Sequence, residues 1–169
     1  MVAPLSARAD TPQVRPEEVL VAVPTLNESA QIAVCLASLI GEDAFMRRTK
    51  VVICDGGSQD STVRIVQNLG QRYENLVCID NPGRLQSAAI NRVVEQEAEP
   101  GHRYLVRCDA HAIYPAHYVQ EVVQRLAALP EAAAVTTAMD ATGTGCLQRA
   151  AAWLVDTPLG SGGSAPRGT

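Results

Sequence analysis

The chain has 169 residues and a formal net charge of −4, with 47% apolar and 19% charged residues. This composition is ordinary for one globular α/β domain, and the lack of a basic stripe argues against nucleic acid as a partner. No apolar run approaches the roughly 18–20 residues of a membrane helix, and five cysteines without a CxxC pair favour neither a zinc ribbon nor a disulfide framework.

The predicted elements alternate between strands and helices. Short apolar, β-branched runs predict buried parallel strands, and apolar residues at helical spacing predict the helices between them. We predict strands over 19–23, 50–54, 75–79, 103–108 and, more weakly, 132–137, and helices over about 28–40, 61–70, 84–93, 115–129 and 145–155. Pro24 should end the first strand because it cannot donate to a ladder, and Asn27 should cap the first helix.

This alternation indicates an α/β fold with a mostly parallel, Rossmann-like sheet flanked by helices on both faces. Right-handed crossovers then bring the carboxyl ends of all strands to one edge, where such sheets bind ligands. Three of the predicted strands are followed there by acidic residues.

The second strand is followed by Asp55, Gly56, Gly57 and Ser58. The glycines let the backbone approach a ligand, and the Asp55 carboxylate could accept a hydrogen bond from N3–H of uracil or N1–H of guanine, which cytosine lacks. The alternative is that Asp55 and Ser58 only shape the turn and cap the next helix.

Two further positions allow a ligand contact or a purely structural role. Glu28 lies near a helix start, where the macrodipole favours an anion, and either caps that helix or contacts a nucleoside, with Thr25 lining the same floor. Arg84 lies at a loop-to-helix junction, where a guanidinium and free amides suit a diphosphate or base edge; the alternative is a solvated arginine. Asn91, two turns later, reaches the ligand or bonds to a loop.

Asp109 and His111, two residues apart after the fourth strand, are the most specific candidates for metal ligands. A metal that bridges a diphosphate needs a few protein ligands and open positions, and oxygen ligands suit Mg²⁺ or Mn²⁺ while an imidazole favours Mn²⁺. The alternative is that Asp109 caps a turn and that His111 is a hydrogen-bonded loop residue.

Together these segments resemble an inverting family 2 glycosyltransferase with the GT-A fold. The matching segments are Val-Pro-Thr-Leu-Asn-Glu at 23–28, Asp-Gly-Gly-Ser-Gln-Asp-Ser-Thr at 55–62, Asn-Pro-Gly-Arg at 81–84 with Ala-Ala-Ile-Asn at 88–91, and Arg-Cys-Asp-Ala-His at 107–111. Tyr-Pro at 114–115 and Gly-Gly-Ser at 162–164 resemble the subgroup of bacterial exopolysaccharide enzymes related to succinoglycan glycosyltransferases. The resemblance covers roughly 18–165.

The resemblance implies roles for individual residues. Pro24, Thr25 and Glu28 would line the nucleoside site, Asp55 would read a uracil-like base, and Asp109 would touch ribose and metal. His111 stands where the family usually has an aspartate. The full set of expected substrate-binding residues is Pro24, Thr25, Glu28, Asp55, Gly57, Ser58, Arg84, Asn91 and Asp109, and the expected metal ligands are Asp109 and His111. The general base is expected beyond Thr169, so no catalytic residue is named.

By this resemblance the protein is an enzyme, a glycosyltransferase of the hexosyltransferase type. It would move a sugar from a nucleotide diphosphate-sugar, expected to be a UDP-sugar, to a glycan or lipid-linked acceptor, with inversion and assisted by Mn²⁺ or Mg²⁺. The alternatives are a non-catalytic nucleotide-sugar-binding module and a sugar nucleotidyltransferase, although the latter would want a Gly-rich basic loop after the first strand.

We expect three regions: a flexible leader at 1–16, a donor-binding domain at 17–140, and the incomplete start of an acceptor-side region at 141–169. Cys54 and Cys108 lie inside apolar runs, so we expect buried free thiols and a reducing, cytosolic setting. In exopolysaccharide biosynthesis for the cell envelope, a longer protein would work in the cytoplasm, with peripheral association at the inner face of the membrane.

Overall fold

The structure, a computed structural model, describes residues 13–137. Its strands are β1 (Val19–Thr25), β2 (Lys50–Asp55), β3 (Leu76–Asp80) and β4 (Tyr104–Arg107), and they form a four-stranded sheet in the order β3-β2-β1-β4. Every pairing in this sheet is parallel. The helices are α1 (Ile32–Ile40), α2 (Thr62–Gly70), α3 (Gln86–Glu97) and α4 (Tyr118–Ala127), and the 3-10 turns η1 (Pro16–Glu18) and η2 (Met46–Arg48) precede β1 and β2. All these elements lie within one compact unit, Thr11–Ala132.

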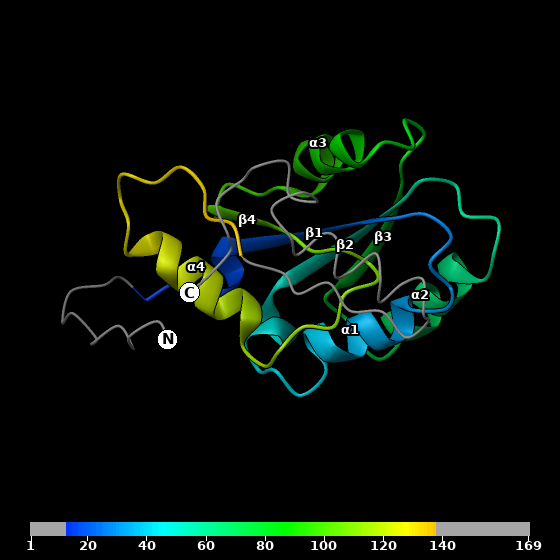
Figure 1. Ribbon diagram of the computed structural model, residues 1–169, viewed down its shortest axis with the longest axis horizontal. Helices are drawn as coiled ribbons and strands as arrows, with labels where there is room; N and C mark the ends of the chain where they lie inside the picture. Colours follow the sequence, from blue (N-terminus) through cyan, green and yellow to red (C-terminus); the bar gives the residue numbers. More distant parts are fainter. Residues whose placement is uncertain (1–12, 138–169) are drawn as a thin grey trace, which may run out of the picture. The chain divides into compact units, whose positions relative to one another are not determined.

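Helices cover both faces of the sheet, as predicted. Val19, Val21 and Val23 of β1 pack in the larger apolar cluster with α1, α2 and α4, while Leu20 and Ala22 point to the opposite face and pack with α3. Figure 1 shows α3 on one side of the sheet and the other three helices on the other side. Because neighbouring residues face opposite helices, β1 has to be apolar at both parities, which explains its unbroken hydrophobic run.

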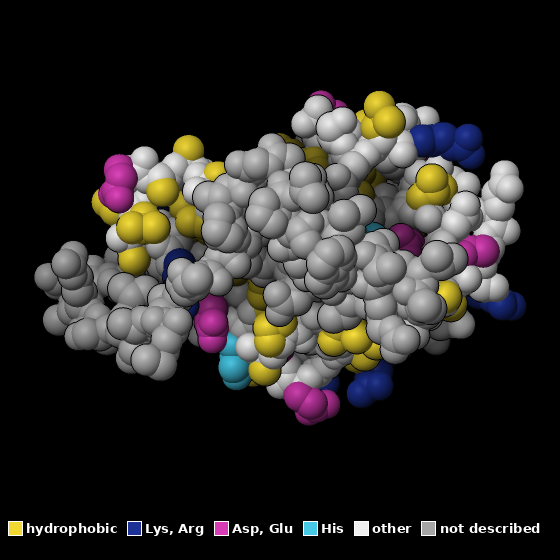
Figure 2. Space-filling view, in the orientation of Figure 1, with side chains coloured by type: hydrophobic (Ala, Val, Ile, Leu, Met, Phe, Trp, Pro, Cys, Tyr) yellow, Lys and Arg dark blue, Asp and Glu magenta, His cyan; other side chains and the backbone are white. Residues whose placement is uncertain are grey.

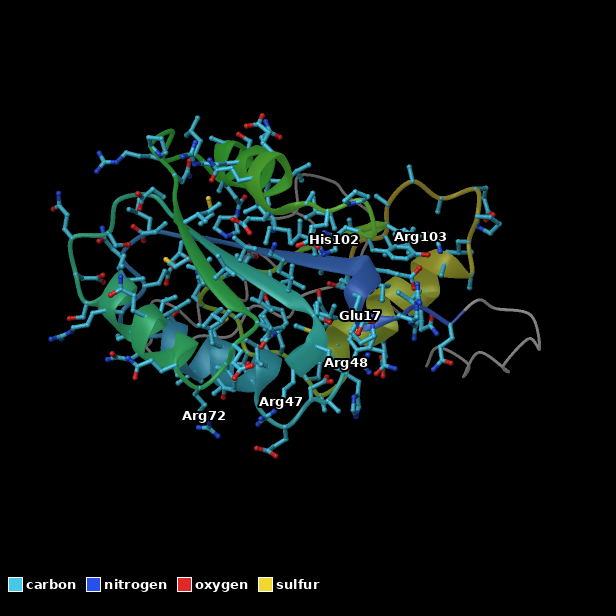
Figure 3. The ribbon with its side chains drawn as sticks, turned by 180° about the vertical axis from the view of Figure 1, so that it is seen from behind. Glu17, Arg47, Arg48, Arg72, His102 and Arg103 are labelled. Carbon is cyan, nitrogen blue, oxygen red and sulfur yellow. The ribbon has the colours of Figure 1, made fainter. Side chains whose placement is uncertain are left out.

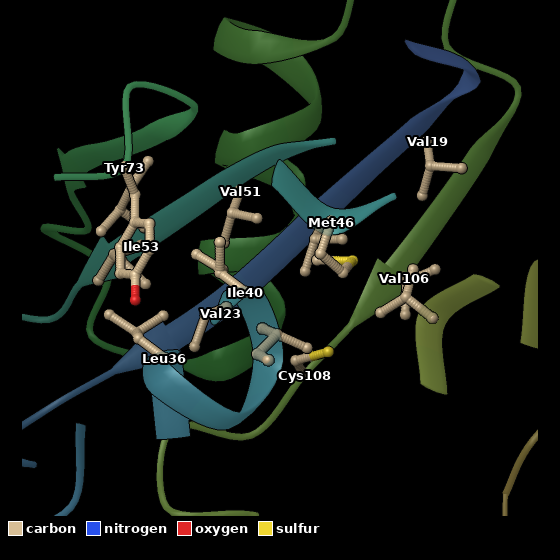
Figure 4. Packing of buried hydrophobic residues seen from close by; sticks show 14 of the residues in the cluster. Val19, Val23, Leu36, Ile40, Met46, Val51, Ile53, Tyr73, Val106 and Cys108 are labelled. Atoms are coloured by element: carbon tan, nitrogen blue, oxygen red, sulfur yellow. The ribbon is translucent and has the colours of Figure 1, made fainter. Parts of the chain in front are cut away.

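The larger cluster forms the main core. Leu36 and Ile40 of α1 are fully buried and pack over the sheet beside Val23, Ile53 and Met46 (Figure 4). Each such side chain contributes roughly 1.5–3 kcal/mol on burial. This packing fixes α1, and with it the loop that connects β1 to α1 at the carboxyl edge.

The prediction that Pro24 ends the first strand was wrong, because β1 continues to Thr25. The amide of Cys108 donates to the carbonyl of Ala22, so even-numbered residues of β1 face β4. Pro24 therefore points its nitrogen toward β4, beyond that strand's last residue, Arg107. No donor is needed there, and the proline interrupts no hydrogen bond with β2.

Three helices begin later than predicted. Asn27, Arg84 and His117 have φ values of 55°, 57° and 62°, and each lies between a strand and the helix that follows. This left-handed backbone cannot be part of an α-helix. For this reason α3 begins two residues after Arg84, and α4 begins at Tyr118 rather than near Pro115. The first helix begins at Ile32, and Asn27 does not cap it because its Oδ1 accepts from the amide of Gln59.

The predicted fifth strand is absent, since residues 132–137 adopt no strand among the described residues. The first three residues of this run, 132–134, are alanine, which has a low strand propensity. The predicted helix over 145–155 lies outside the described residues. None of the helices within 13–137 is long and apolar enough to span a bilayer.

The strand order reverses direction between β1 and β4. From β1 the chain moves outward through β2 to β3, and then crosses back to place β4 on the other side of β1. In open parallel sheets the crevice at such a reversal, beyond the carboxyl ends of the strands, is the place where ligands bind. The candidate site therefore lies beyond Thr25 and Arg107.

Candidate functional site

A hollow of about 180 Å³ lies at this reversal. Its lining residues are Pro24, Thr25, Leu26, Glu28, Asn81, Arg84, Leu85, Gln86, Asp109, Ala110 and His111. Six of the residues predicted from sequence are among them, namely Pro24, Thr25, Glu28, Arg84, Asp109 and His111. A larger hollow of about 390 Å³ lies beside η1 and η2, at the opposite edge of the sheet, and no predicted site residue lines it.

Asp55 does not line the hollow and is occupied by its own turn. Its Oδ2 accepts hydrogen bonds from the amides of Gly57 (2.9 Å) and Ser58 (2.8 Å), and its Oδ1 accepts one from the hydroxyl of Ser58 (2.5 Å). These contacts match the turn-shaping alternative. Asp55 is buried, and because a carboxylate oxygen can accept two hydrogen bonds, Oδ1 has the capacity for one more than this turn supplies.

Arg84 lies over this turn. Its Nε donates to the carbonyl of Gly56 at 3.1 Å, and a Cβ on Gly57 would lie 3.5 Å from its guanidinium. Gly57 has a φ of +84°, which a glycine adopts without strain. The loop before α3 therefore meets the loop after β2, although the two are far apart in sequence.

Asn81, which the sequence analysis missed, fixes that loop. It is buried, its amide nitrogen donates to the carbonyl of Asp55 (2.6 Å), and its side-chain Nδ2 donates to the carbonyl of Leu85 (3.0 Å). A buried side-chain amide with its hydrogen bonds satisfied specifies one loop conformation. The Asn-Pro-Gly signal pointed to a turn but not to this role.

The loops after β1 and β2 are joined by side-chain hydrogen bonds. The amide of Glu28 donates to the hydroxyl of Thr62 (2.8 Å), and the amide of Ser29 donates to Asp60 (3.1 Å). Hydrogen bonds from the hydroxyl of Thr62 first, and then from Ser29, hold the pKa of Asp60 well below its usual value, against the opposing effect of burial. Glu28 is thus anchored through its backbone, and its side chain is left to face the hollow.

The backbone of Asp109 is held by Tyr114. The amide of Asp109 donates to the tyrosine hydroxyl (2.6 Å), and that hydroxyl is within 3.1 Å of the Asp109 carbonyl, to which it donates. Burial raises the pKa of Tyr114, so the hydroxyl keeps its proton. The Tyr-Pro pair at 114–115 is visible in the sequence, but its contact with Asp109 is not.

The carboxylate of Asp109 contacts two residues that the sequence analysis did not assign. One guanidinium nitrogen of Arg107 lies 3.3 Å from each carboxylate oxygen, and Nε2 of Gln86 lies 3.4 Å from Oδ1. Arg107 also donates to Oε1 of Gln86 (3.0 Å). Asp109 therefore has a positive partner on the protein itself.

His111 contacts Glu28 across the hollow, with Nδ1 3.1 Å from the glutamate Oε1. Among residues 13–137 no three His, Cys, Asp or Glu side chains converge as a metal cluster would require. Carboxylate oxygen and imidazole nitrogen are nevertheless suitable ligand types for Mn²⁺, and two protein ligands suffice when a diphosphate supplies others. Asp109 and His111 fit a divalent cation in their chemistry, provided that Asp109 changes partner.

The remaining predicted residues lie away from this pair. Asn91 is exposed on α3 and does not line the hollow. Cys54 and Cys108 are buried free thiols, as expected. Burial raises the pKa of Cys108, and that of Cys35 beneath the same loop, to about 12, which leaves neither as a nucleophile near neutral pH. On the face shown in Figure 2, acidic and basic side chains are scattered over the described surface rather than gathered by sign.

The sheet and its helices define an open parallel α/β fold with a polar hollow at its strand-order reversal. Residues 20–151 match the sequence profile of Glycosyl transferase family 2, and the chain belongs to that family. It is 38% identical over 148 residues to the succinoglycan biosynthesis protein ExoA of Rhizobium meliloti, covering 88% of this chain and 44% of that protein.

Solved structures share the fold. A mannosyltransferase from Pyrobaculum calidifontis, in complex with GDP-Man and Mn²⁺, matches with a TM-score of 0.56 and 26% identity over 72% of this chain and 36% of that one. TarS from S. aureus, in complex with UDP-GlcNAc, matches with a TM-score of 0.52 and 18% identity over 73% and 38%, which shows the fold alone. The chain thus spans less than half the length of these proteins.

Proposed function

We propose that this chain is the donor-binding portion of a glycosyltransferase that moves a sugar from a nucleotide diphosphate-sugar to a glycan or lipid-linked acceptor, with inversion. The observation that carries the proposal is the hollow, where Thr25, Glu28, Arg84, Asp109 and His111 converge at the strand-order reversal of a family 2 member. The name of the succinoglycan relative supports exopolysaccharide biosynthesis as the setting.

Asp55 would select the base. The free acceptor position on Oδ1 would take N3–H of uracil or N1–H of guanine, while cytosine has no proton at N3. A UDP-sugar is the donor we propose, and the mannosyltransferase complex with GDP-Man makes GDP the necessary comparison. Pro24 and Thr25 would form the floor beneath the nucleoside.

The diphosphate would lie near Arg84 and the start of α3, where a guanidinium and free amides favour an anion. Asp109 and His111 would hold Mn²⁺ or Mg²⁺. Since Glu28 contacts Nδ1 of His111, Nε2 is the ring nitrogen left for a metal. When bound, the cation would neutralise charge on the departing diphosphate.

The attacking hydroxyl of the acceptor needs a general base. Both carboxylates that line the hollow, Glu28 and Asp109, have partners within the described residues, so we place the base in a longer protein. A module that binds the donor without transferring the sugar is the second candidate, because both carboxylates of the hollow are already paired. Both candidates place the protein in the cytoplasm, with peripheral association at the inner face of the membrane.

The proposal is tested by calorimetric titration of UDP, GDP and CDP into the protein, each with Mn²⁺, Mg²⁺ or EDTA. We expect UDP to bind, Mn²⁺ to tighten its binding, and CDP to bind at least tenfold more weakly, as expected when one hydrogen bond to a charged group is lost. A folded sample that binds no nucleotide under any of these conditions would refute the proposal.

Two near-isosteric variants test the assigned residues. Asp55→Asn should reduce the preference for UDP over CDP, and Asp109→Asn should reduce the effect of Mn²⁺. Glu74→Gln, an exposed position with the same charge change, is the matched control and should alter neither. Release of UDP from a UDP-sugar in the presence of a glycan or lipid-linked acceptor separates an active enzyme from a binding module.

A further inference from the structure

Arg107 places a second positive charge beside the hollow, where it contacts two of the lining residues, Gln86 and Asp109. Arg107 is the last residue of β4 and Gln86 is the first residue of α3. Val106 points into the larger cluster on the opposite face of the sheet, so Arg107 projects toward α3. Residues from two separate elements therefore meet over the Asp109 carboxylate.

Both carboxylate oxygens of Asp109 have a partner, but the contacts are long. Both carboxylate oxygens face Arg107 or Gln86, and the Asp109 side chain is only 14% exposed. The contacts measure 3.3–3.4 Å, beyond the usual 2.7–3.2 Å of a hydrogen bond, and the Arg107 side chain is 49% exposed. An exposed arginine held by long contacts can leave its partner at low cost.

A divalent cation held by Asp109 would compete with Arg107 for the same carboxylate. The charged side chains that line the hollow are Glu28, Arg84 and Asp109, together with His111 when protonated. Arg84 already donates to the carbonyl of Gly56. Without another positive charge, an incoming diphosphate would face two carboxylates with one arginine to offset them.

We propose that Arg107 is an internal counter-ion that also binds the donor diphosphate. In the free protein it neutralises Asp109. When a divalent cation takes the carboxylate, Arg107 turns to the diphosphate, and when no cation is present it screens the diphosphate from Asp109. Gln86 accepts a hydrogen bond from Arg107 and donates one to Asp109, so it would orient both side chains as Arg107 moves from Asp109 to the diphosphate. This inference rests on the proposed function, because it concerns the same nucleotide.

The test compares UDP affinity in EDTA and in Mn²⁺ for the wild type and Arg107→Met. In EDTA the variant leaves Asp109 uncompensated, so UDP binding should weaken by about tenfold or more, the factor expected for a lost charged hydrogen bond. In Mn²⁺ the cation no longer has to displace the arginine, which offsets part of the loss. The dissociation constant of UDP in EDTA divided by that in Mn²⁺ should therefore be about fivefold or more higher for the variant than for the wild type.

Arg103→Met is the matched control. Arg103, labelled in Figure 3, precedes β4 at the opposite edge of the sheet. It pairs with Glu18, and its loss changes the net charge equally. It should leave the ratio unchanged. Arg107→Lys keeps the charge and should retain most of the affinity in EDTA.

Equal weakening in EDTA and Mn²⁺, or no weakening in either, would overturn the inference while leaving the proposed function intact. A ratio that rises equally in Arg103→Met would also overturn it, because only the net charge would then matter. If the wild type itself binds no UDP, the proposed function fails first. Circular dichroism of each variant confirms that folded samples are compared.

Discussion

Replacing Tyr114 by phenylalanine removes a single oxygen from beneath the candidate site. The Asp109 amide would lose its acceptor at 2.6 Å, and the Asp109 carbonyl would lose its donor at 3.1 Å. The thiol of Cys35 would remain near that carbonyl, with its sulfur at 3.5 Å, but it is a weak donor. The contact between the rings of Tyr114 and Tyr118, with centroids 4.9 Å apart, would be preserved.

The expected loss follows from these contacts. An unpaired buried amide costs about 1–3 kcal/mol, and because Asp109 is only partly buried we expect the free energy of unfolding to fall by about 1–2 kcal/mol. With a slope of about 2 kcal/mol per molar urea, the midpoint should fall by about 0.5–1 M. UDP affinity should weaken as well, since the backbone that carries Asp109 and His111 is less tightly held.

Urea unfolding monitored by circular dichroism measures this loss. Tyr104→Phe is the matched control, because the described residues give the Tyr104 hydroxyl no hydrogen bond, and its unfolding free energy should change by less than about 0.5 kcal/mol. Equal midpoints for the two variants would show that the tyrosine hydroxyl does not hold the Asp109 segment, and the reasoning would be refuted.

Three further predictions concern the loops and the buried thiols. Hydrogen bonds lower the pKa of Asp60 in the folded protein, so its ionised form adds stability above about pH 4. The wild type should therefore have a higher urea midpoint than Asp60→Asn at pH 7, and it should lose that advantage as the pH falls below about 4. Gly57→Ala should destabilise by about 1–2 kcal/mol because of its φ of +84°, whereas Gly56→Ala, with no atom closer than 3.5 Å, should be tolerated; thermal melts distinguish them. Burial raises the pKa of Cys35 to about 12, so site-resolved mass spectrometry should find it unmodified by iodoacetamide at pH 8 until urea unfolds the chain.

Much of the sheet was predictable from local sequence. The β-branched runs of β1 and β2 identify strands because a strand buried on both faces must be apolar at both parities. The parallel topology brings the segments that follow the strands to one edge, and Thr25, Asp109 and His111 lie together there. The starts of α1, α3 and α4 were not predictable, because the left-handed backbone at Asn27, Arg84 and His117 depends on the surrounding loops.

The partners of the site residues were also beyond sequence reasoning. Gln86 meets Arg107 only because β4 adds beside β1 while α3 covers that face, and a single sequence does not specify strand order. The orientation of Asp55 is similar, since one carboxylate can serve a turn or a ligand and only coordinates show that this one holds Gly57 and Ser58.

The central strand β1 extends further toward the carboxyl edge than its neighbour β4, the edge strand of the sheet. β1 runs to Thr25, but its last pairing with β4 is Ala22 with Arg107. If β4 continued beyond Arg107, Pro24 would offer it no amide donor. The proline therefore disfavours an extension of the β1–β4 ladder toward the hollow. Pro24 thus limits the pairing between β1 and β4 and leaves the space beside the end of β1 unfilled by the sheet. Valine at position 24 would keep the pairing with β2 and would supply the amide that an extension of β4 toward the hollow needs.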